Sequence, residues 1–222
     1  QKIALVGANG LGKTTLLNAV VWEIPRDNRI LLIQNPTEIM IYERSEETGA
    51  NMRNALHWEA VDIDIRLKDD PTTPSMANMI AHTLRNTPDV IVPGEVRTPA
   101  EFFQMNRALK TGHRVLSTMH AYDGGDAVSR IATELATLGG SVQDYASSIA
   151  SSLDIAVSQR KLADGTRHVM SIEEYTGRIK EDGTAETSVL FRFKLTGQVD
   201  KDENGKIKKI HGYFEQVNPI SE

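Results

Sequence analysis

The sequence contains no cysteine, and this absence excludes several kinds of site at once. A chain without cysteine has no disulfide framework, no thiolate metal site and no cysteine nucleophile. Long apolar runs are also lacking, because none approaches the roughly 20 residues that a helix needs to span a bilayer. We find no signal-peptide pattern either. These absences predict a soluble, cytoplasmic domain.

Positively charged residues are fewer than negatively charged ones: the sequence has 25 Lys and Arg residues and 30 Asp and Glu residues. The formal net charge of −5 makes nucleic acid an unlikely direct ligand, because domains that bind it usually carry a basic face. A local basic patch is compatible with these totals. The 222 residues suffice for one large core, alone or with a small appendage. The start at Gln1, without Met, predicts a fragment that lacks an N-terminal domain.

The most informative segment that is present is a glycine-rich stretch directly after the apolar run Ile3–Val6. Its residues are Gly7, Ala8, Asn9, Gly10, Leu11, Gly12, Lys13, Thr14 and Thr15. The first eight fit G-x-x-x-x-G-K-[ST], with an expected strand before and an expected helix after. Backbone N–H groups of such a loop surround a phosphate, and the start of the helix attracts the same anion. The motif predicts an ATP and Mg²⁺ site, with Lys13 on the β- and γ-phosphates and the Thr14 hydroxyl on the metal.

Apolar runs and helical periodicity predict an α/β core. Four runs without alternation are typical of parallel strands that are buried on both faces. They are Ile3–Val6, Ile30–Ile33, Val90–Val92 and Val115–Met119. The expected helices are Lys13–Glu23, Ser75–Arg85, a helix from the capping box Thr98–Glu101 to Gly112, Asp126–Leu138 and one that starts after Ser141. Alternating apolar and charged residues predict a half-exposed strand over Val61–Leu67.

The pattern changes after about residue 152. Later segments predict strands that are joined by turns at residues 163–165 and 200–205. These segments are Leu153–Leu162, Arg167–Tyr175, Val189–Leu195 and Lys206–Glu215. We therefore expect a nucleotide-binding core over residues 1–152 and a β-rich extension over residues 153–222 that packs on it.

The ends of the predicted strands select further candidates. In open α/β sheets ligands bind at the carboxyl ends of the strands. Of the two acids that flank one strand, Glu95 shares an end with the glycine-rich loop, whereas Asp89 is expected to cap the far end. Glu95 is therefore a candidate for the Mg²⁺ shell or for polarising the attacking water. The same argument favours Thr118 and His120 over His113 as residues that face the nucleotide.

Arginine side chains are relevant because phosphoryl transfer depends on positioning and on charge stabilisation. Arg97 lies two residues after Glu95, and we favour a functional role for it. Arg85 and Arg130 are interpreted as surface ion pairs, which contribute little. The alternative that a neighbouring subunit supplies an arginine to this site stays open.

Several segments together resemble the secretion ATPases, the motors of type II and type IV secretion, pilus assembly and conjugation. In order they are Gly7–Thr15, Leu84–Asp89, Gly94–Arg97, Thr111–His113 and Ser117–Ala121. Two later segments, Leu162–Arg167 and Leu190–Phe193, resemble the CpaF branch of tight-adherence pili. The resemblance covers nearly the whole chain.

This resemblance implies a RecA-like P-loop NTPase core with a mainly parallel sheet and a β-rich C-terminal extension. It implies an ATP-hydrolysing homohexamer at the cytoplasmic face of the membrane, with inner-membrane secretion or pilus platform proteins as partners. By position, Gly7–Thr15 would be Walker A, and Glu95 the Walker B carboxylate and a metal ligand together with Thr14. Arg97 would be its accompanying arginine, and His120 would belong to the histidine box. In such enzymes an N-terminal domain completes the site.

One segment departs from the family pattern. The second strand of the family usually ends in Ile-Glu-Asp, with another Glu three residues later, whereas this chain has Gln34 and Asn35 and keeps only Glu38. Amides can orient water but cannot act as general bases at neutral pH. Glu38 is therefore a catalytic candidate, and two functions stay open: a motor ATPase, and a nucleotide-binding scaffold or switch with little hydrolysis. A DNA-translocating motor is disfavoured by the acidic balance.

Overall fold

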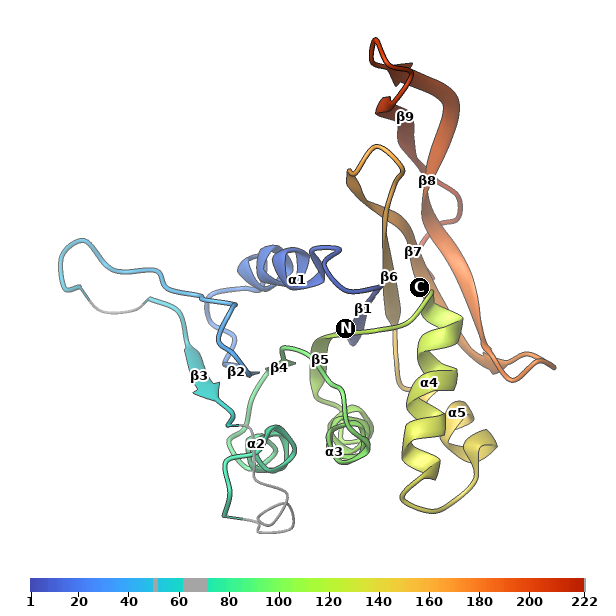
Figure 1. Ribbon diagram of the computed structural model, residues 1–222. Helices are drawn as coiled ribbons and strands as arrows, with labels where there is room; N and C mark the ends of the chain where they lie inside the picture. Colours follow the sequence, from blue (N-terminus) through green and yellow to red (C-terminus); the bar gives the residue numbers. More distant parts are fainter. Residues whose placement is uncertain (50–51, 62–71, 222) are drawn as a thin grey trace.

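The computed structural model describes residues 1–49, 52–61 and 72–221, which form a nine-stranded sheet with helices on both faces (Figure 1). The strands are β1 (Ile3–Val6), β2 (Ile30–Gln34), β3 (Ala55–Glu59), β4 (Val90–Pro93), β5 (Arg114–Met119), β6 (Ile155–Lys161), β7 (Arg167–Ile179), β8 (Ala185–Lys201) and β9 (Ile207–Gln216). The helices are α1 (Lys13–Trp22), α2 (Met76–Thr83), α3 (Pro99–Lys110), α4 (Gly124–Ala136) and α5 (Val142–Ala150).

The sheet has a parallel half and an antiparallel half. The strand order is β3-β2-β4-β5-β1-β6-β7-β8-β9. In this spatial order, the strands from β3 through β2, β4, β5 and β1 to β6 pair in parallel. The strands β7, β8 and β9 continue the sheet with antiparallel pairing. The predicted mixed α/β fold with a mainly parallel sheet and β-rich C-terminal strands is confirmed. Because β6 pairs with β1, the sheet runs without a break across residues 152–153.

The parallel strands form because both of their faces are covered. In β1, Leu5 packs toward α1, whereas Ala4 and Val6 pack toward the helices on the other face. Figure 1 shows α1 on one side of the sheet and α2 to α5 on the other. Continuous apolar runs such as Ile30–Ile33 thus have a partner for every side chain, and all four of these residues are buried.

The helices begin where their caps place them. Thr98 and Glu101 form the predicted capping box of α3, with Pro99 at the first helical position. Ser141 caps α5 as expected. In α2 the cap is Ser75, so this helix starts one residue later than predicted and Pro74 lies outside it. The helix α4 begins two residues before Asp126, because Asp123 accepts a hydrogen bond as its N-cap.

The antiparallel strands are longer than the sequence indicated. The strand β8 covers 17 residues, although the apolar pattern predicted only Val189–Leu195. Pairing with β9 extends it into polar sequence, since each strand satisfies the backbone groups of the other. The outer parts of these strands project beyond the helices in Figure 1. Their side chains are mostly exposed.

Two expectations concern the region after β2. The strand β3 pairs in parallel with β2 at the edge of the sheet, and it was not predicted. Its five residues, Ala-Leu-His-Trp-Glu, form no buried apolar run, which was the signal for β1, β2, β4 and β5. The strand predicted over Val61–Leu67 lies outside the described residues except for Val61, which is in no strand.

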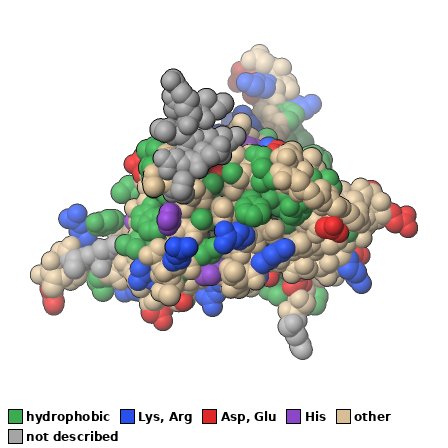
Figure 2. Space-filling model, turned by 90° about the horizontal axis from the view of Figure 1, so that it is seen from below, with side chains coloured by type: hydrophobic (Ala, Val, Ile, Leu, Met, Phe, Trp, Pro, Cys, Tyr) green, Lys and Arg blue, Asp and Glu red, His purple; other side chains and the backbone are tan. Residues whose placement is uncertain are grey.

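Charge is unevenly spread over the surface. On the face seen in Figure 2, several Lys and Arg side chains lie near the middle, among hydrophobic ones, and most acidic side chains lie nearer the rim. This face therefore has a local basic character although the chain is acidic overall. Within the described residues, no helix combines the length and the apolarity that crossing a membrane requires.

Candidate functional site

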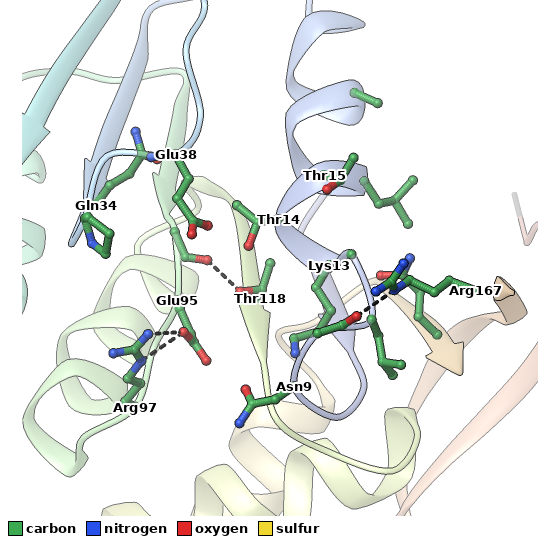
Figure 3. A pocket seen from close by; sticks show the side chains of 18 of the residues that line it. Asn9, Lys13, Thr14, Thr15, Gln34, Glu38, Glu95, Arg97, Thr118 and Arg167 are labelled. Atoms are coloured by element: carbon green, nitrogen blue, oxygen red, sulfur yellow. Dashed lines mark hydrogen bonds and ion pairs between the residues drawn. The ribbon is translucent and has the colours of Figure 1, made fainter. Parts of the chain in front are cut away.

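An open cleft of about 860 Å³ lies at the carboxyl edge of the parallel strands (Figure 3). The glycine-rich loop and the start of α1 form one wall, and the segments after β2 and β4 form the other. The wall from the loop and helix comprises Asn9, Gly10, Leu11, Gly12, Lys13, Thr14, Thr15, Leu16 and Ala19. The other lining residues are Gln34, Asn35, Pro36, Glu38, Gly94, Glu95, Arg97, Thr118, Gln159 and Arg167.

Close packing and backbone geometry shape the glycine-rich loop. A Cβ atom on Gly7 would lie 2.7 Å from the backbone oxygen of Gln159 in β6, so a larger residue would displace the loop. Gly12 adopts φ +85° as the N-cap of α1, a conformation that favours glycine. Among the described residues, no side chain caps this helix, and its first turn holds no acid. The first N–H groups of α1 therefore face the cleft as an anion-binding end.

The side chain of Lys13 is buried and points back over its own loop. Its Nζ donates to Gly7 O and to Ala8 O, both at 2.9 Å, and lies 3.4 Å from His120 Nδ1. Burial lowers the pKa of the Lys13 ammonium from its ordinary value, and the charge of Glu95 opposes that shift. Gly7, Ala8 and His120, which these contacts join to Lys13, line a second hollow, whereas Lys13 lines the cleft.

The carboxylate of Glu95 is contacted by His120 on one side and by Arg97 on the other. One carboxylate oxygen lies 2.6 Å from His120 Nε2, and the other accepts hydrogen bonds from Nε and from a terminal nitrogen of Arg97. Burial alone would raise the pKa of Glu95, but the hydrogen bond and charge of Arg97 and the charges of His120 and Lys13 hold it below its ordinary value. Glu95 is therefore ionised at neutral pH.

Hydrogen bonds between the ends of β4 and β5 set the position of Glu95. Thr118 Oγ1 donates to Gly94 O at 2.8 Å, and the backbone N–H of Thr118 donates to the same oxygen at 3.1 Å. The N–H of Val96 donates to Thr118 O at 3.3 Å, which closes a parallel bridge between Glu95 and Thr118. Thr118 is buried, and these contacts join the Glu95 segment to β5.

Gln34 holds the loop that follows β2. Its side-chain oxygen accepts from the backbone N–H groups of Glu38 (2.9 Å) and Ile39 (2.6 Å), and its Nε2 donates to Ile39 O at 2.8 Å. The residue is buried, with 2% of its surface exposed. Gln34 thus connects the end of a strand to the exposed Glu38, whose side chain points into the cleft (Figure 3).

The residues that were expected at the opposite edge lie there. Asp89 Oδ2 accepts from the backbone N–H of Arg29 at 2.7 Å, at the amino ends of β2 and β4. His113 Nδ1 lies 2.9 Å from Thr111 Oγ1, between α3 and β5. Neither residue lines the cleft.

Two lining residues come from the C-terminal strands and were missed as site residues. Gln159 lies in β6, and Arg167 begins β7 and donates from Nε to Gly10 O at 2.6 Å. Arg167 is 157 residues away from Gly10 in the sequence. The sequence did mark the segment that contains Arg167 as family-like, but it held no signal that this segment reaches the glycine-rich loop.

The site therefore combines the glycine-rich loop, the buried Lys13 and the ionised Glu95 at the carboxyl edge of a mainly parallel sheet. No cluster of three or more His, Cys, Asp or Glu side chains suited to a metal occurs in the described ranges. A metal here would need ligands beyond side chains, such as phosphate oxygens and water. The strand, loop and helix at this position define the class of P-loop α/β proteins.

The chain belongs to the type II/IV secretion system protein family, whose model matches residues 1–196. A twitching motility protein of Neisseria gonorrhoeae is 31% identical over 175 residues, which cover 77% of this chain and 42% of that protein. The conjugal transfer protein TrbB of Rhizobium radiobacter is 30% identical over 181 residues, covering 79% and 49%. The chain spans less than half the length of these relatives. The resemblance to the secretion ATPases is thus confirmed at the level of the family.

Solved structures share the fold. The VirB11 ATPase of the Brucella suis type IV secretion system aligns with a TM-score of 0.64 and 22% identity, over 78% of this chain and 48% of that one. The pilus retraction motor PilT with bound ADP aligns with a TM-score of 0.58 and 23% identity, over 85% and 46%. At this identity the likeness shows the fold alone.

Proposed function

We propose that this chain is the ATP-binding motor domain of a secretion, pilus-assembly or conjugation ATPase, which couples ATP hydrolysis to protein export or pilus assembly. The contact series Lys13–His120–Glu95 carries the proposal, with spacings of 3.4 Å and 2.6 Å. It sets a phosphate-binding lysine beside an ionised carboxylate at the strand ends, where phosphoryl transfer needs both. Membership of the secretion family supports the same reading.

The residues present fit a nucleoside triphosphate with Mg²⁺. The backbone of Gly7–Thr15 and the uncapped start of α1 would hold the phosphates. Lys13 would exchange its two carbonyl acceptors for phosphate oxygens. Thr14 and Glu95 offer the oxygen ligands that Mg²⁺ prefers. ATP supplies the phosphoanhydride bond, and Mg²⁺ neutralises part of its charge.

Within this site Glu95 would orient and polarise the attacking water. Its depressed pKa keeps it ionised, so it accepts a hydrogen bond from water at neutral pH. His120 and Arg97 each hold one of its oxygens and so restrict its rotation. Glu38, after β2, lines the same wall of the cleft as Glu95 and is a second acceptor (Figure 3).

The test is ATP turnover by the complete protein with Glu95→Gln, which keeps the shape and removes the charge. We expect turnover to fall by about 100-fold or more, while ATP affinity changes only slightly. Glu203→Gln, in an exposed turn, is the matched control and should keep the wild-type rate. Equal turnover in the Glu95 and Glu203 variants would exclude Glu95 as the catalytic carboxylate.

A second candidate function is a nucleotide-binding scaffold or switch that hydrolyses little. The observation in its favour is that Gln34 is a neutral amide whose oxygen and nitrogen are both occupied by the loop after β2. Asn35→Asp in the complete protein restores one acid of the usual pair. A rate at least about tenfold above wild type would favour this candidate, whereas an unchanged rate would favour the motor.

We further propose that the protein acts as a homohexamer at the cytoplasmic face of the membrane, bound to inner-membrane platform proteins. Relatives named for twitching motility, conjugal transfer and the type IV pilus support this setting. Native mass spectrometry of the complete protein with ATP should show a six-subunit species. Nucleic acid is not expected as a ligand, so DNA should leave turnover unchanged at low salt.

A further inference from the structure

The turn between β6 and β7 carries a cation to the glycine-rich loop. Arg167, the first residue of β7, is exposed at the cleft and donates from Nε to Gly10 O at 2.6 Å. Gly10 O is a neutral acceptor, so this hydrogen bond does not neutralise the charge of Arg167. By contrast, Arg97 on the opposite wall is bonded to the carboxylate of Glu95.

Arg167 lies on the side of the loop away from Glu95. A Cβ atom on Gly12 would lie 3.8 Å from Arg167 Cδ and 3.9 Å from Thr15 Oγ1, so these three residues are neighbours. Figure 3 shows Arg167 to one side of Lys13 and Glu95 to the other. Thr14 and Lys13 are the residues of such a loop that serve the metal and the β- and γ-phosphates. With a nucleotide bound at this loop, the Arg167 side would lie nearer the α-phosphate.

We propose that Arg167 is a nucleotide-binding residue, supplied by the C-terminal strands, whose guanidinium contacts the phosphates on the Thr15 side of the loop. This inference rests on nucleotide binding at the glycine-rich loop and adds a residue that the loop motif does not contain. A guanidinium suits the role because it keeps its charge and offers five donors. One donor, Nε, is bonded to Gly10 O, and the side chain lines the cleft.

The turn that carries Arg167 is braced at its other end. Asp164 Oδ1 accepts from the backbone N–H (2.9 Å) and the hydroxyl (2.6 Å) of Thr166, which fixes the residues just before Arg167. Asp164 Oδ2 accepts from the backbone N–H of Ile210 in β9 at 2.8 Å. A pre-positioned arginine loses less conformational entropy when it binds an anion.

The experiment measures Mg-ATP and ADP affinity of the complete protein by titration calorimetry. Arg167→Gln keeps a donor for Gly10 and removes the charge, whereas Arg167→Lys keeps the charge. Arg178→Gln, on the exposed part of the same strand, is the matched control. We expect Arg167→Gln to weaken both affinities about tenfold, Arg167→Lys by less than about threefold, and the control to match wild type. Unfolding temperatures without nucleotide should stay equal.

Two results would overturn the inference alone. One is an Arg167→Gln affinity within twofold of wild type; the other is equal weakening in the Gln and Lys variants together with a lower unfolding temperature, which would make Arg167 a structural brace. Lys13→Ala separates this outcome from failure of the proposed function. If wild type binds ATP and Lys13→Ala does not, the site stands whatever Arg167 does. If wild type fails to bind, both proposals fall.

Discussion

The two halves of the sheet are stabilised by different means. In the parallel half, every residue of β2 and β4 is buried, and side chains on alternate faces join two separate core clusters. In the antiparallel half, most residues of β8 and β9 are partly or fully exposed, and pairing of the strands supplies most of their contacts. The candidate site belongs to the buried half, because the loop Gly7–Thr15 follows β1 and Glu95 follows β4.

Truncating one buried and one exposed leucine tests this difference. The buried truncation should cause the largest loss of stability that we expect of any variant. Leu32→Ala in β2 removes a fully buried side chain and should lower the free energy of unfolding by about 2–5 kcal/mol. Leu195→Ala in β8, which is 47% exposed, should cost about 1 kcal/mol or less. Denaturant unfolding of the complete protein compares the two. Equal costs would show that β8 is covered in solution by a contact outside this chain.

The same contrast explains which elements the sequence revealed. Ile30–Ile33 and Val90–Val92 were recognised because burial on both faces requires unbroken apolar runs. The outer part of β8, from Thr196 to Lys201, was missed because its residues are exposed and mostly polar, and the turn predicted over 200–205 was wrong for its first two residues, which belong to the strand. It is a strand because β9 pairs with it, and pairing between distant segments leaves little trace in local composition.

The candidate site divides in a similar way. The strand-end rule placed Glu95, Thr118 and His120 correctly beside the loop, since all parallel strands end at one edge. It could not show that the side chain of Gln34 is bonded to the backbone of Glu38 and Ile39, because other orientations of this side chain fit the same sequence. Nor could it show that Arg167 reaches Gly10, which depends on how the last strands join the sheet.

Gln34→Glu should have an intermediate effect on the free energy of unfolding. Glu at this position would still accept from the N–H groups of Glu38 and Ile39, but its second oxygen would face Ile39 O, where Gln34 Nε2 now donates at 2.8 Å. Loss of a buried donor next to a carbonyl costs about 1–3 kcal/mol, so Gln34→Glu should lower the free energy of unfolding by that amount. Denaturant unfolding measures it.

The control for this variant comes from the antiparallel half. Gln198→Glu makes the same replacement of an amide by a carboxylate at an exposed position in β8. It should alter the free energy of unfolding by no more than about 0.5 kcal/mol. A Gln34→Glu protein as stable as the control would mean that the loop after β2 is not held by this amide. The argument for a natively slowed site would then lose its structural basis.

The smallest effect concerns the contact that ties the β6–β7 turn to β9. Asp164 and Asp182 occupy equivalent positions in two Asp-Gly-Thr turns, and each accepts from the N–H and hydroxyl of the following Thr. Only for Asp164 does the second oxygen also accept from Ile210, among the hydrogen bonds of the described residues. Hydrogen bonds from Thr166, and then from Ile210, hold the pKa of Asp164 at about 2 although burial acts in the opposite direction.

A carboxyl group with a depressed pKa stabilises the folded state above its unfolded pKa, and this contribution is lost as the pH falls through the folded value. The Asp164 contact should therefore persist at neutral pH and weaken between about pH 4 and pH 2. Asp164→Asn should speed amide hydrogen exchange in residues 207–216 at neutral pH, because an amide nitrogen cannot accept from Ile210. Asp182→Asn should leave that exchange unchanged. If both variants behave alike, β9 is held by strand pairing alone, and the turn that carries Arg167 is not braced by it.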